Sequence, residues 1–473
     1  MVKIFQVLLI FITSLLLAAC GGGGGGGGSS GEAVGGGAIP QCSENASYVD
    51  GEYNFMGNGG TYTSTNLYGL GSVCASAAYG RGATGDGQLI AVLDSGISVG
   101  EGTTTDLNQI NSNIATFLTG SDVINSDNVP QDDDNNNNTA LGSGHGSHVA
   151  GLIANEHNNS SFGGHGIAYD ATLHIIKVLD EDGSGSFAQI AAGMDLARGV
   201  SSMDIVNLSL GSSGVIGSTC DSASSCETAL GSTIYTAMEA LGSASIIQVY
   251  AAGNDGNSSP NTLAGAAIYD DDFKETTVIA VAIDSTGNLA SYSDKCGVAK
   301  AICIAAPGSS LYSFFSSNAQ SSYAVDSYAQ SMSGTSQAAP LVSGGLALIK
   351  QEFSSLTNAQ VIDRLLATAL DTGEYSKSTI YGHGLMNLNG ATAAVAKLQT
   401  INGSNLLDDP NTSYYDLAHN SFLSSAAFSN ALNNALAGHT MEVYDSFDRA
   451  NFDVAVNSFF TSGSYTSQNT IEN

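Results

Sequence analysis

Between residues 85 and 370 the sequence alternates short apolar runs with stretches of helical periodicity. The runs are apolar throughout, which is typical of strands covered on both faces. Repeated strand–helix units of this kind predict a parallel sheet with helices on both sides. The expected strands are 89–93, 173–179, 205–210, 246–252, 278–283 and 302–305. The expected helices are 187–197, 227–241, 341–353 and 358–370, with a further helix that begins at His145.

Polar residues follow two of these strands, where sites in such sheets are found, beyond the carboxyl ends of the strands. Asp94 follows strand 89–93 in the segment D-S-G, and Asn254 follows strand 246–252 in G-N-D-G. His145 opens the helix predicted for G-H-G-S-H-V-A-G-L-I-A. A carboxylate, an amide and an imidazole are thus candidates for one site.

The segment G-T-S-Q-A-A-P adds a candidate nucleophile, Ser336. A serine hydroxyl needs a neighbouring base, and taken alone Ser336 could equally begin a helix as its N-cap. His145 could take the proton, because imidazole titrates near neutral pH, and Asp94 could orient the imidazole. The Asn254 amide and the Ser336 backbone N–H could then bind a developing oxyanion.

Five segments in this order resemble the subtilisin-like serine proteases. They are IAVLDSGI (90–97), GHGSHVAGLIA (144–154), IVNLSLG (205–211), AAGND (251–255) and SGTSQAAPLVSG (333–344). The resemblance spans roughly residues 85 to 390, and the order Asp, His, Ser is the one subtilisin has. It implies a doubly wound, mostly parallel, three-layer α/β fold and a serine endopeptidase that acts on proteins or peptides.

Carried over by position, Asp94, His145 and Ser336 match the catalytic triad, and Asn254 matches the oxyanion-hole residue. His148, three residues after His145, competes for the role of base, but the resemblance makes it a structural histidine.

Two further segments resemble those between which the family holds an extended peptide. A peptide bound in this way adds a strand through main-chain hydrogen bonds. For Gly183 and Gly185 a plain surface turn is the alternative. The residues concerned are Gly183, Ser184 and Gly185, and Ser209, Leu210 and Gly211.

The sequence departs from the family pattern at several positions. Gln337 stands where the family has Met, and Ser147 where it has Thr. The usual His-Pro-Asp-Leu appears as T-T-D-L at 104–107. The stretch between the glycine-rich segment and Asp94 is too short for the folded inhibitory propeptide that many relatives carry.

No cofactor is expected. The run DDDNNNN (132–138) is expected to be a solvated loop. A calcium site is the second interpretation of this run, because hard cations prefer oxygen ligands.

The pattern of the N-terminal residues is typical of a targeting segment. An apolar run from Ile4 to Ala19 follows Lys3 and is too short to span a bilayer comfortably. Small residues before Cys20 predict cleavage and export. The ending L-A-A-C resembles a bacterial lipobox, which implies lipidation of Cys20 and attachment to the outer membrane or cell surface. A plain signal peptide with an incidental cysteine is the alternative.

Six further cysteines, an even number in an exported chain, suggest disulfides, for which 15 connectivities exist. The short spacings favour Cys220–Cys226 and Cys296–Cys303, which leaves Cys42–Cys74. Free buried thiols are the alternative. The spacings offer no zinc site.

The charge balance limits the class of partner. Lys and Arg number 12 against 43 Asp and Glu, a net charge of −31. Such a surface repels phosphate backbones, so a nucleic-acid partner is not expected. A monomer is expected.

The C-terminal residues suggest a second segment of the chain. Residues 421–436 carry one apolar helical face that Gly438 can end. With 443–456, they resemble the junction that joins autotransporter subtilases to their barrel, for which the remaining residues are too few. Either the chain is truncated, or it has lost the barrel and reaches the surface another way. The predicted organisation is a signal peptide over 1–19, a Gly-rich tether over 20–40, a peptidase domain over 41–395 and a partly helical extension over 396–473.

Two other functions are alternatives to that of a protease. A catalytically silent surface-binding module could use the same fold, although the complete set of four site residues argues against it. An α/β-hydrolase esterase would need G-x-S-x-G and the chain order Ser, Asp, His. This chain has Ala338 in place of the final Gly, and the reverse order.

Overall fold

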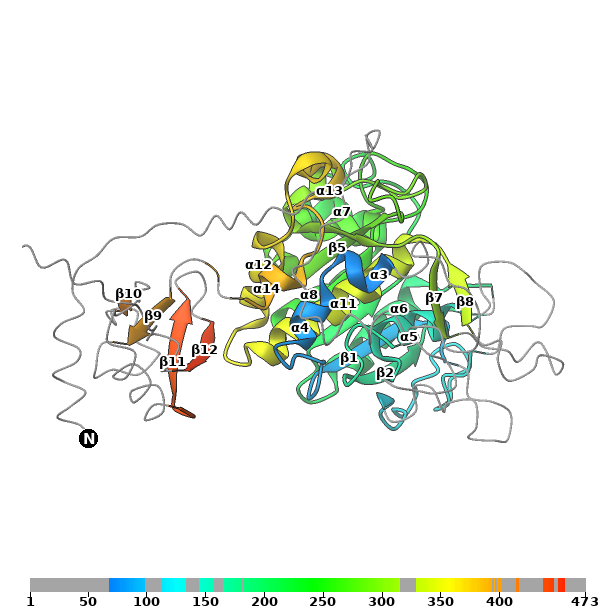
Figure 1. Cartoon of the computed structure of the whole chain (residues 1–473). Coiled ribbons are helices and arrows are strands. Elements are labelled where there is room, and N and C mark those ends of the chain that lie inside the picture. Colours follow the sequence, from blue (N-terminus) through cyan, green and yellow to red (C-terminus); the bar gives the residue numbers. More distant parts are fainter. Residues whose placement is uncertain are drawn as a thin grey trace, which may run out of the picture. The chain divides into compact units, whose positions relative to one another are not determined.

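The structure is a computed structural model. It describes residues 68–97, 113–132, 144–156, 165–180, 182–314, 329–393, 395, 398–401, 414–416, 437–445 and 450–455. The chain divides into two units, one of residues 33–393 and one of residues 1–32 together with 394–473 (Figure 1). The predicted signal peptide, tether and lipidation site at Cys20 lie outside the described residues, as does the segment T-T-D-L at 104–107.

Six parallel strands form the sheet of the larger unit, in the order β2-β1-β3-β4-β5-β6. They are β1 Leu89–Asp94, β2 Thr172–Lys177, β3 Ile205–Leu208, β4 Ile247–Ala251, β5 Thr277–Ile283 and β6 Cys303–Pro307. All seven residues of β5 are buried, as expected for a strand covered on both faces. The predicted fold class and its six strands are confirmed, with ends that shift by a few residues.

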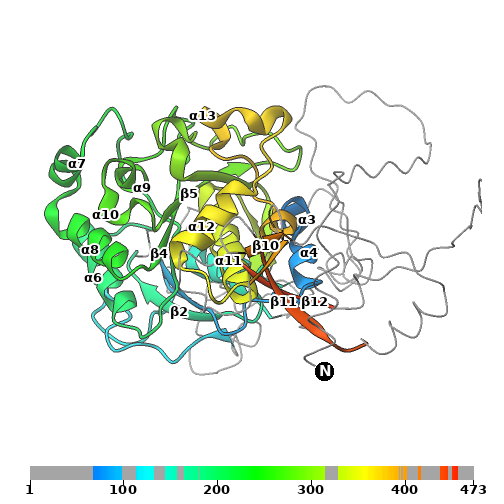
Figure 2. The ribbon, with the colours of Figure 1, turned by 90° about the vertical axis from the view of Figure 1, so that its left-hand side faces the viewer.

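Helices cover both faces of this sheet, and Figure 2 shows the three layers. Helices α6 and α8 pack together on one face, and α8 contacts α10. Helix α11 packs against β3, β4, β5 and β6 on the other face, next to α5 and α12. Their bounds are α5 His145–Ala154, α6 Phe187–Arg198, α8 Ser232–Ser243, α10 Asp271–Lys274, α11 Thr335–Glu352 and α12 Asn358–Ala367.

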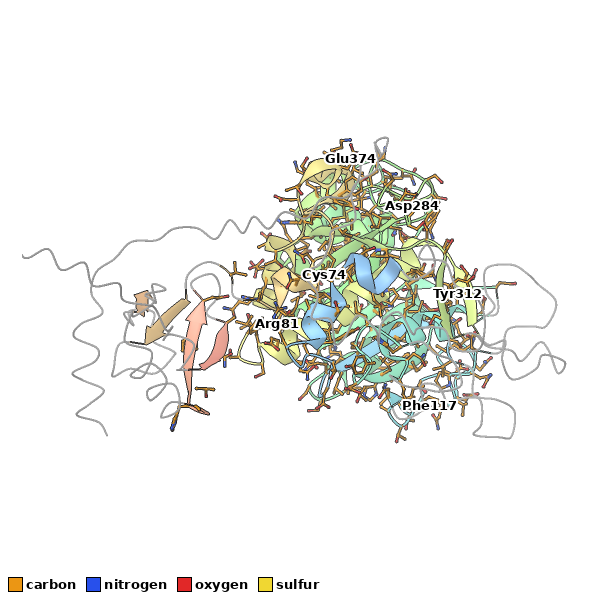
Figure 3. The ribbon with its side chains drawn as sticks, in the orientation of Figure 1. Cys74, Arg81, Phe117, Asp284, Tyr312 and Glu374 are labelled. Atoms are coloured by element: carbon orange, nitrogen blue, oxygen red, sulfur yellow. A yellow bond between two sulfur atoms is a disulfide. The ribbon has the colours of Figure 1, made fainter. Side chains whose placement is uncertain are left out.

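Short elements complete the larger unit. The helices are α3 Tyr68–Ser72, α4 Ala75–Tyr79, α7 Ala223–Leu230, α9 Thr262–Gly265, α13 Ser378–Tyr381 and α14 Leu388–Ala391. The 3₁₀ turns are Ala266–Tyr269, Gly297–Ile302 and Gly373–Ser376. Strands β7 Leu311–Phe314 and β8 Ala329–Met332 pair antiparallel. Arg81 donates to Thr392 Oγ1 at 2.7 Å and to Asn389 Oδ1 at 2.9 Å, which ties the end of α4 to α14 (Figure 3).

The single helix predicted over 227–241 is wrong, because the structure has two helices there, α7 and α8. Gly231 separates them with φ 90° and ψ 143°, a conformation outside any helix that glycine adopts at little cost. Helix α7 has its own start, where the Ser222 hydroxyl accepts from the Ser225 N–H in a capping box.

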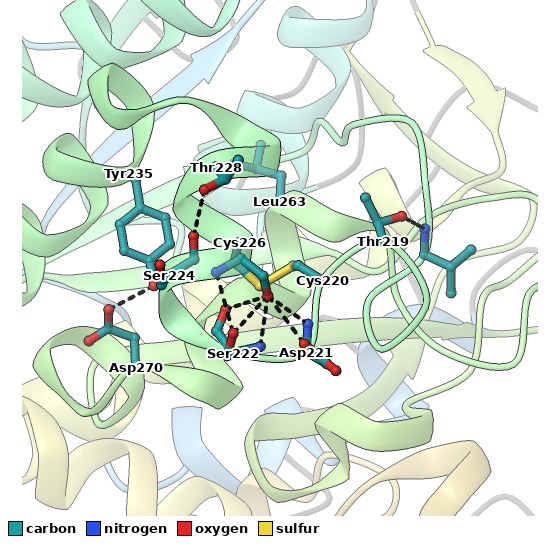
Figure 4. The surroundings of a disulfide bond; sticks show 12 residues. Thr219, Cys220, Asp221, Ser222, Ser224, Cys226, Thr228, Tyr235, Leu263 and Asp270 are labelled. Atoms are coloured by element: carbon teal, nitrogen blue, oxygen red, sulfur yellow. Dashed lines mark hydrogen bonds between the residues drawn. A yellow bond between two sulfur atoms is a disulfide. The ribbon is translucent and has the colours of Figure 1, made fainter.

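Two of the three expected disulfides are confirmed. Cys220–Cys226 closes the approach to α7 (Figure 4), and Cys296–Cys303 closes the turn before β6. Cys74 is disulfide-bonded, but Cys42, its predicted partner, lies outside the described residues.

The smaller unit contains a four-stranded antiparallel sheet in the order β10-β9-β11-β12. The strands are β9 Leu398–Ile401, β10 Tyr414–Asp416, β11 Thr440–Asp445 and β12 Asn451–Ala455. The helix predicted over 421–436 lies outside the described residues. Across the ranges that the structure describes, no helix is both long and apolar enough to cross a membrane.

Candidate active site

The parallel sheet brings the predicted site residues to one edge. Strand β1 ends at Asp94, whose side chain is fully buried. Its neighbours are β2 and β3, and β4 lies beyond β3. Because parallel strands end at the same edge, the segments after β1, β2, β3 and β4 all meet there.

Asp94 and His145 form a direct pair. Asp94 Oδ1 lies 2.7 Å from His145 Nδ1 and accepts the Ser95 N–H at 2.7 Å. A carboxylate only accepts hydrogen bonds, so this contact places the proton of a neutral imidazole on Nδ1 and leaves Nε2 as the basic nitrogen. The His145 side chain is 19% exposed, whereas that of Asp94 is fully buried.

Two glycines let α5 begin against the turn that follows β1. Gly144, the N-cap, has φ 70°. A Cβ on Gly146 would lie 2.2 Å from the backbone oxygen of Gly96. No other residue fits at Gly146 without moving the helix, so this glycine sets the position of His145 relative to Asp94.

A buried carboxylate, Asp132, lies behind this pair. Asp132 Oδ1 accepts from the Ser95 hydroxyl at 3.1 Å, and Oδ2 accepts from the Ser147 hydroxyl at 2.8 Å. The Ser95 hydroxyl also accepts the Gly146 N–H at 2.9 Å. The expectation of a solvated loop is wrong for Asp132, which is fully buried. Residues 133–138 of that run lie outside the described part of the chain.

Lys177 reinforces the same turn from β2. It stands opposite Asp94 in the pairing of β1 with β2. Its side chain is 1% exposed, and Nζ donates to the Ser95 carbonyl at 2.7 Å. Burying an ammonium group demands such partners, so Lys177 is part of the support for the turn after Asp94.

Ser336 lies in the first turn of α11, directly after Gly334, the N-cap, and Thr335. Its hydroxyl donates to the Ser209 carbonyl at 3.2 Å. N–H groups in the first turn of a helix have no partner within the helix, so the Ser336 N–H can serve an external acceptor.

Pro340 explains how the Ser336 backbone is anchored. In a helix the N–H of residue 340 would bond the Ser336 carbonyl, but proline has no N–H. The Ser209 hydroxyl takes that place and donates to the Ser336 carbonyl at 2.8 Å. Asn207 Nδ2 donates to the Ser209 hydroxyl at 3.0 Å, and the Ser343 hydroxyl donates to Asn207 Oδ1 at 2.8 Å. This chain of bonds joins β3 to α11 beneath Ser336.

Asn254 lies beside Ser336, exposed in the loop after β4. Its Oδ1 accepts the Thr335 N–H at 2.8 Å and the Thr335 hydroxyl at 3.0 Å. These two donors fix which end of the amide is oxygen. A Cβ on Gly334 would lie 3.4 Å from Asn254 Nδ2 and 3.5 Å from the Ser336 nitrogen. The atom nearest to such a Cβ is Gln337 Oε1, at 2.8 Å, so two donors and one acceptor lie around the same position beside Gly334.

The two candidate substrate segments follow β2 and β3, the strands on either side of β1. Gly183 has φ 71° and donates to the Asp180 carbonyl at 3.0 Å in an exposed turn. A Cβ on Gly185 would lie 2.2 Å from the Val178 oxygen. Ser184 is exposed as well, Ser209 and Leu210 are buried, and Gly211 is exposed.

Two neighbouring residues have structural surroundings. His148 is buried, and its Nε2 lies 3.1 Å from the Leu311 carbonyl oxygen on β7. Gln337 is 1% exposed, and its Nε2 has no hydrogen-bond partner among the described residues.

One group of carboxylates could share a cation among the described residues. Ligand oxygens of Glu239, Asp270 and Asp272 lie within 4.8 Å of one another, on and beside α8 and α10. Tyr235 donates to Asp270 Oδ2 at 2.7 Å (Figure 4). Burial, and then the charges of Asp270 and Asp272, raise the pKa of Glu239. These residues do not belong to the edge where Asp94 lies.

Comparison with known proteins identifies the family. The profile of the Subtilase family matches residues 85–384. Subtilisin DY of Bacillus licheniformis is 34% identical over 326 residues, which cover 68% of this chain and 97% of that protein. Subtilisin Savinase of Lederbergia lenta is 35% identical over 325 residues, with 69% and 98% covered.

A solved structure of a protease from Pseudoalteromonas arctica agrees. It matches with a TM-score of 0.50 and 27% identity, covering 68% of this chain and 93% of that one. The chain belongs to the subtilase family. It is a subtilisin-like serine endopeptidase, as the sequence motifs predicted.

Proposed function

We propose that this endopeptidase cleaves peptide bonds through an acyl-enzyme on Ser336, with His145 as general base and Asp94 as its orienting partner. The observation that carries the proposal is the 2.7 Å contact between Asp94 Oδ1 and His145 Nδ1 at the edge where α11 presents Ser336. The contact leaves Nε2 of His145 to take the hydroxyl proton. To react, the Ser336 hydroxyl must turn from the Ser209 carbonyl toward Nε2, and catalytic hydrogen bonds often form only when substrate is bound.

The reaction then runs in two halves. Ser336 Oγ attacks the peptide carbonyl as His145 accepts its proton, and the tetrahedral oxyanion accepts from Asn254 Nδ2 and the Ser336 N–H. His145 returns the proton to the leaving amine, which leaves an ester on Ser336. Water activated by the same imidazole hydrolyses that ester. The N-terminus of α11, an 18-residue helix, favours the negative charge. All these groups belong to this chain, so the proposed chemistry needs no cofactor.

An extended peptide is the substrate form that suits this site. We place it between residues 183–185 and residues 209–211, which follow the two strands that flank β1. Main-chain hydrogen bonds would supply affinity, and side-chain pockets would supply preference.

An active-site probe tests the nucleophile. A fluorophosphonate should label the purified protein on Ser336, and Ser336→Ala should lose both the label and casein hydrolysis. Ser333→Ala, three residues earlier, is the matched control and should keep both. Label on another residue, or casein cleavage that survives Ser336→Ala, would contradict the proposal.

We further propose that the protease is exported and held at the outer membrane or cell surface by a lipid on Cys20, from which it could be released. The proposal is supported by the apolar run before L-A-A-C and by the glycine-rich segment after it. Cys20→Ser should move the protein from the membrane fraction to the soluble fraction and abolish incorporation of labelled palmitate. Unchanged membrane association would rule out this anchor.

A further inference from the structure

The loop that carries Asn254 is folded around the side chain of Asp294. Asp294 Oδ1 accepts the Asn257 N–H at 2.6 Å and the Asp255 N–H at 3.2 Å. Asp294 Oδ2 accepts from Asn257 Nδ2 at 3.3 Å. The side chain is fully buried. Three N–H donors from one loop thus converge on one carboxylate.

The backbone on both sides of Asp294 holds the same loop. The Asp294 N–H donates to the Gly253 carbonyl at 2.9 Å, and the Gly256 N–H donates to the Tyr292 carbonyl at 2.8 Å. The Lys295 N–H donates to the Asn257 carbonyl at 3.0 Å. Residues 292–295 therefore bond the loop before and after Asn254.

Gly253 permits this close contact. Its φ is 122°, and a Cβ there would lie 2.3 Å from Asp294 Oδ2. On its other side, the Gly253 N–H donates to Thr335 Oγ1 at 3.1 Å, and Thr335 also orients the Asn254 amide. Thr335 sets the direction of the Asn254 side chain, whereas Asp294 sets the path of its main chain.

We propose that Asp294 is a positioning residue of the oxyanion hole, which acts by shaping residues 253–257 so that Asn254 Nδ2 and the Ser336 N–H reach the same oxyanion. The inference rests on the role proposed above for Asn254. Asp294 touches no reacting atom, so its effect on the reaction must pass through Asn254.

An acidic side chain suits this position because backbone N–H groups can only donate. A carboxylate accepts all three bonds, and charge assistance strengthens them. An asparagine at 294 would accept at one oxygen only and would turn an NH₂ group toward either the backbone donors or Asn257 Nδ2. Burial raises the pKa of Asp294, and the hydrogen bonds from Asn257 oppose that shift.

A double-mutant cycle tests the inference. The variants are Asp294→Ala, Asp294→Asn, Asn254→Ala and the two double mutants, each assayed for kcat and KM on a peptide anilide and for thermal stability. The matched control is Asp122→Ala. Asp122 is 1% exposed and accepts from the backbone N–H and Nδ2 of Asn125 at 2.8 and 3.0 Å, outside the oxyanion loop, the name we give to residues 253–257.

We expect Asp294→Ala to lower kcat by ~10- to 100-fold with KM within about threefold, because an oxyanion contact is made only in the transition state. Asp294→Asn should lower kcat by ~3- to 10-fold, since one oxygen is kept. In the Asn254→Ala background either substitution should lower kcat by less than about twofold. Asp122→Ala should lower stability with the kcat of the wild type.

Equal kcat losses in the two backgrounds, or a loss confined to KM, would overturn the role of Asp294 while leaving that of Asn254 intact. A wild-type kcat in Asn254→Ala alone would overturn both. If Asp294→Ala does not fold, the cycle with Asp294→Asn decides by the same criteria.

Discussion

The two sides of the candidate active site are each supported by a buried carboxylate, but the bonds differ. On the base side, Asp132 accepts from the hydroxyl groups of Ser95 and Ser147 at 3.1 and 2.8 Å, and from the Ser147 N–H only at a longer 3.4 Å. On the oxyanion side, Asp294 accepts backbone N–H groups of the loop around Asn254. A hydroxyl can rotate to accept as well as donate, whereas an amide N–H cannot. The base side should therefore tolerate a neutral substitute better than the oxyanion side does.

The largest contrast between the two sides should come from removing the base. His145→Ala should lower kcat by about 10⁶-fold, the scale found in subtilisin itself, a member of this family, when its histidine is removed. The single-turnover rate on a peptide anilide measures it. A loss of less than about 10³-fold would exclude His145 as the base.

Removing the oxyanion donor should have a smaller effect. Asn254→Ala should lower kcat by about 10²- to 10³-fold with little change in KM, again the scale found in subtilisin. Steady-state kinetics across a series of peptide anilides provide the test. If kcat fell as far as in His145→Ala, the division into two sides would have no basis.

Changing Asp132, the carboxylate that supports the base side, should reduce stability. Asp132→Ala should lower the free energy of unfolding by about 1–3 kcal/mol, because it leaves buried hydroxyl groups without an acceptor. Asp132→Asn should cost less than half of that, since the Ser95 and Ser147 hydroxyls, which donate the shorter bonds, can turn and accept, whereas the Ser147 N–H donates only at 3.4 Å. Urea denaturation measures both. Equal losses would show that the charge of Asp132 matters as much as its shape.

The smallest effect is a pH trend on the oxyanion side. Because burial raises the pKa of Asp294, the folded protein holds that proton more tightly than the unfolded chain does. The resulting stability is present below about pH 4, the ordinary range of Asp, and is lost as the pH rises through the raised pKa. Asp294→Asn does not titrate, so its Tm minus that of the wild type should increase from about pH 3.5 to 7. A difference that falls or stays constant over this range would contradict the assignment.

Much of the fold follows from local sequence patterns. The apolar runs predict the six strands because a strand that is buried on both faces is apolar along its whole length. The break at Gly231 was missed because apolar periodicity continues through it, while the backbone there takes φ 90°. Apolar periodicity indicates which face of a helix is buried, but it does not reveal a residue with positive φ.

For a similar reason, the sequence predicts some residues of the site and not others. Asp94, His145, Asn254 and Ser336 stand in recognisable motifs, and the structure brings them to one edge of the sheet. Asp132 and Asp294 stand in ordinary loop sequence, and each has a partner 37 positions away along the chain, Ser95 for Asp132 and Asn257 for Asp294. No local pattern records such a contact. The bonds between the SYSD segment at 291–294 and residues 253–257 exist only in the folded chain, so the sequence alone does not reveal them.

The placement of Ser336 on α11 has a consequence for biosynthesis. Helix α11 packs on β3, β4, β5 and β6, so it docks only when almost the whole sheet exists. Contacts between segments so distant in the chain form slowly. Residue 336, the proposed nucleophile, also follows all six strands of the sheet in the chain. The order of the elements therefore places completion of the proposed catalytic site late in the assembly of the domain.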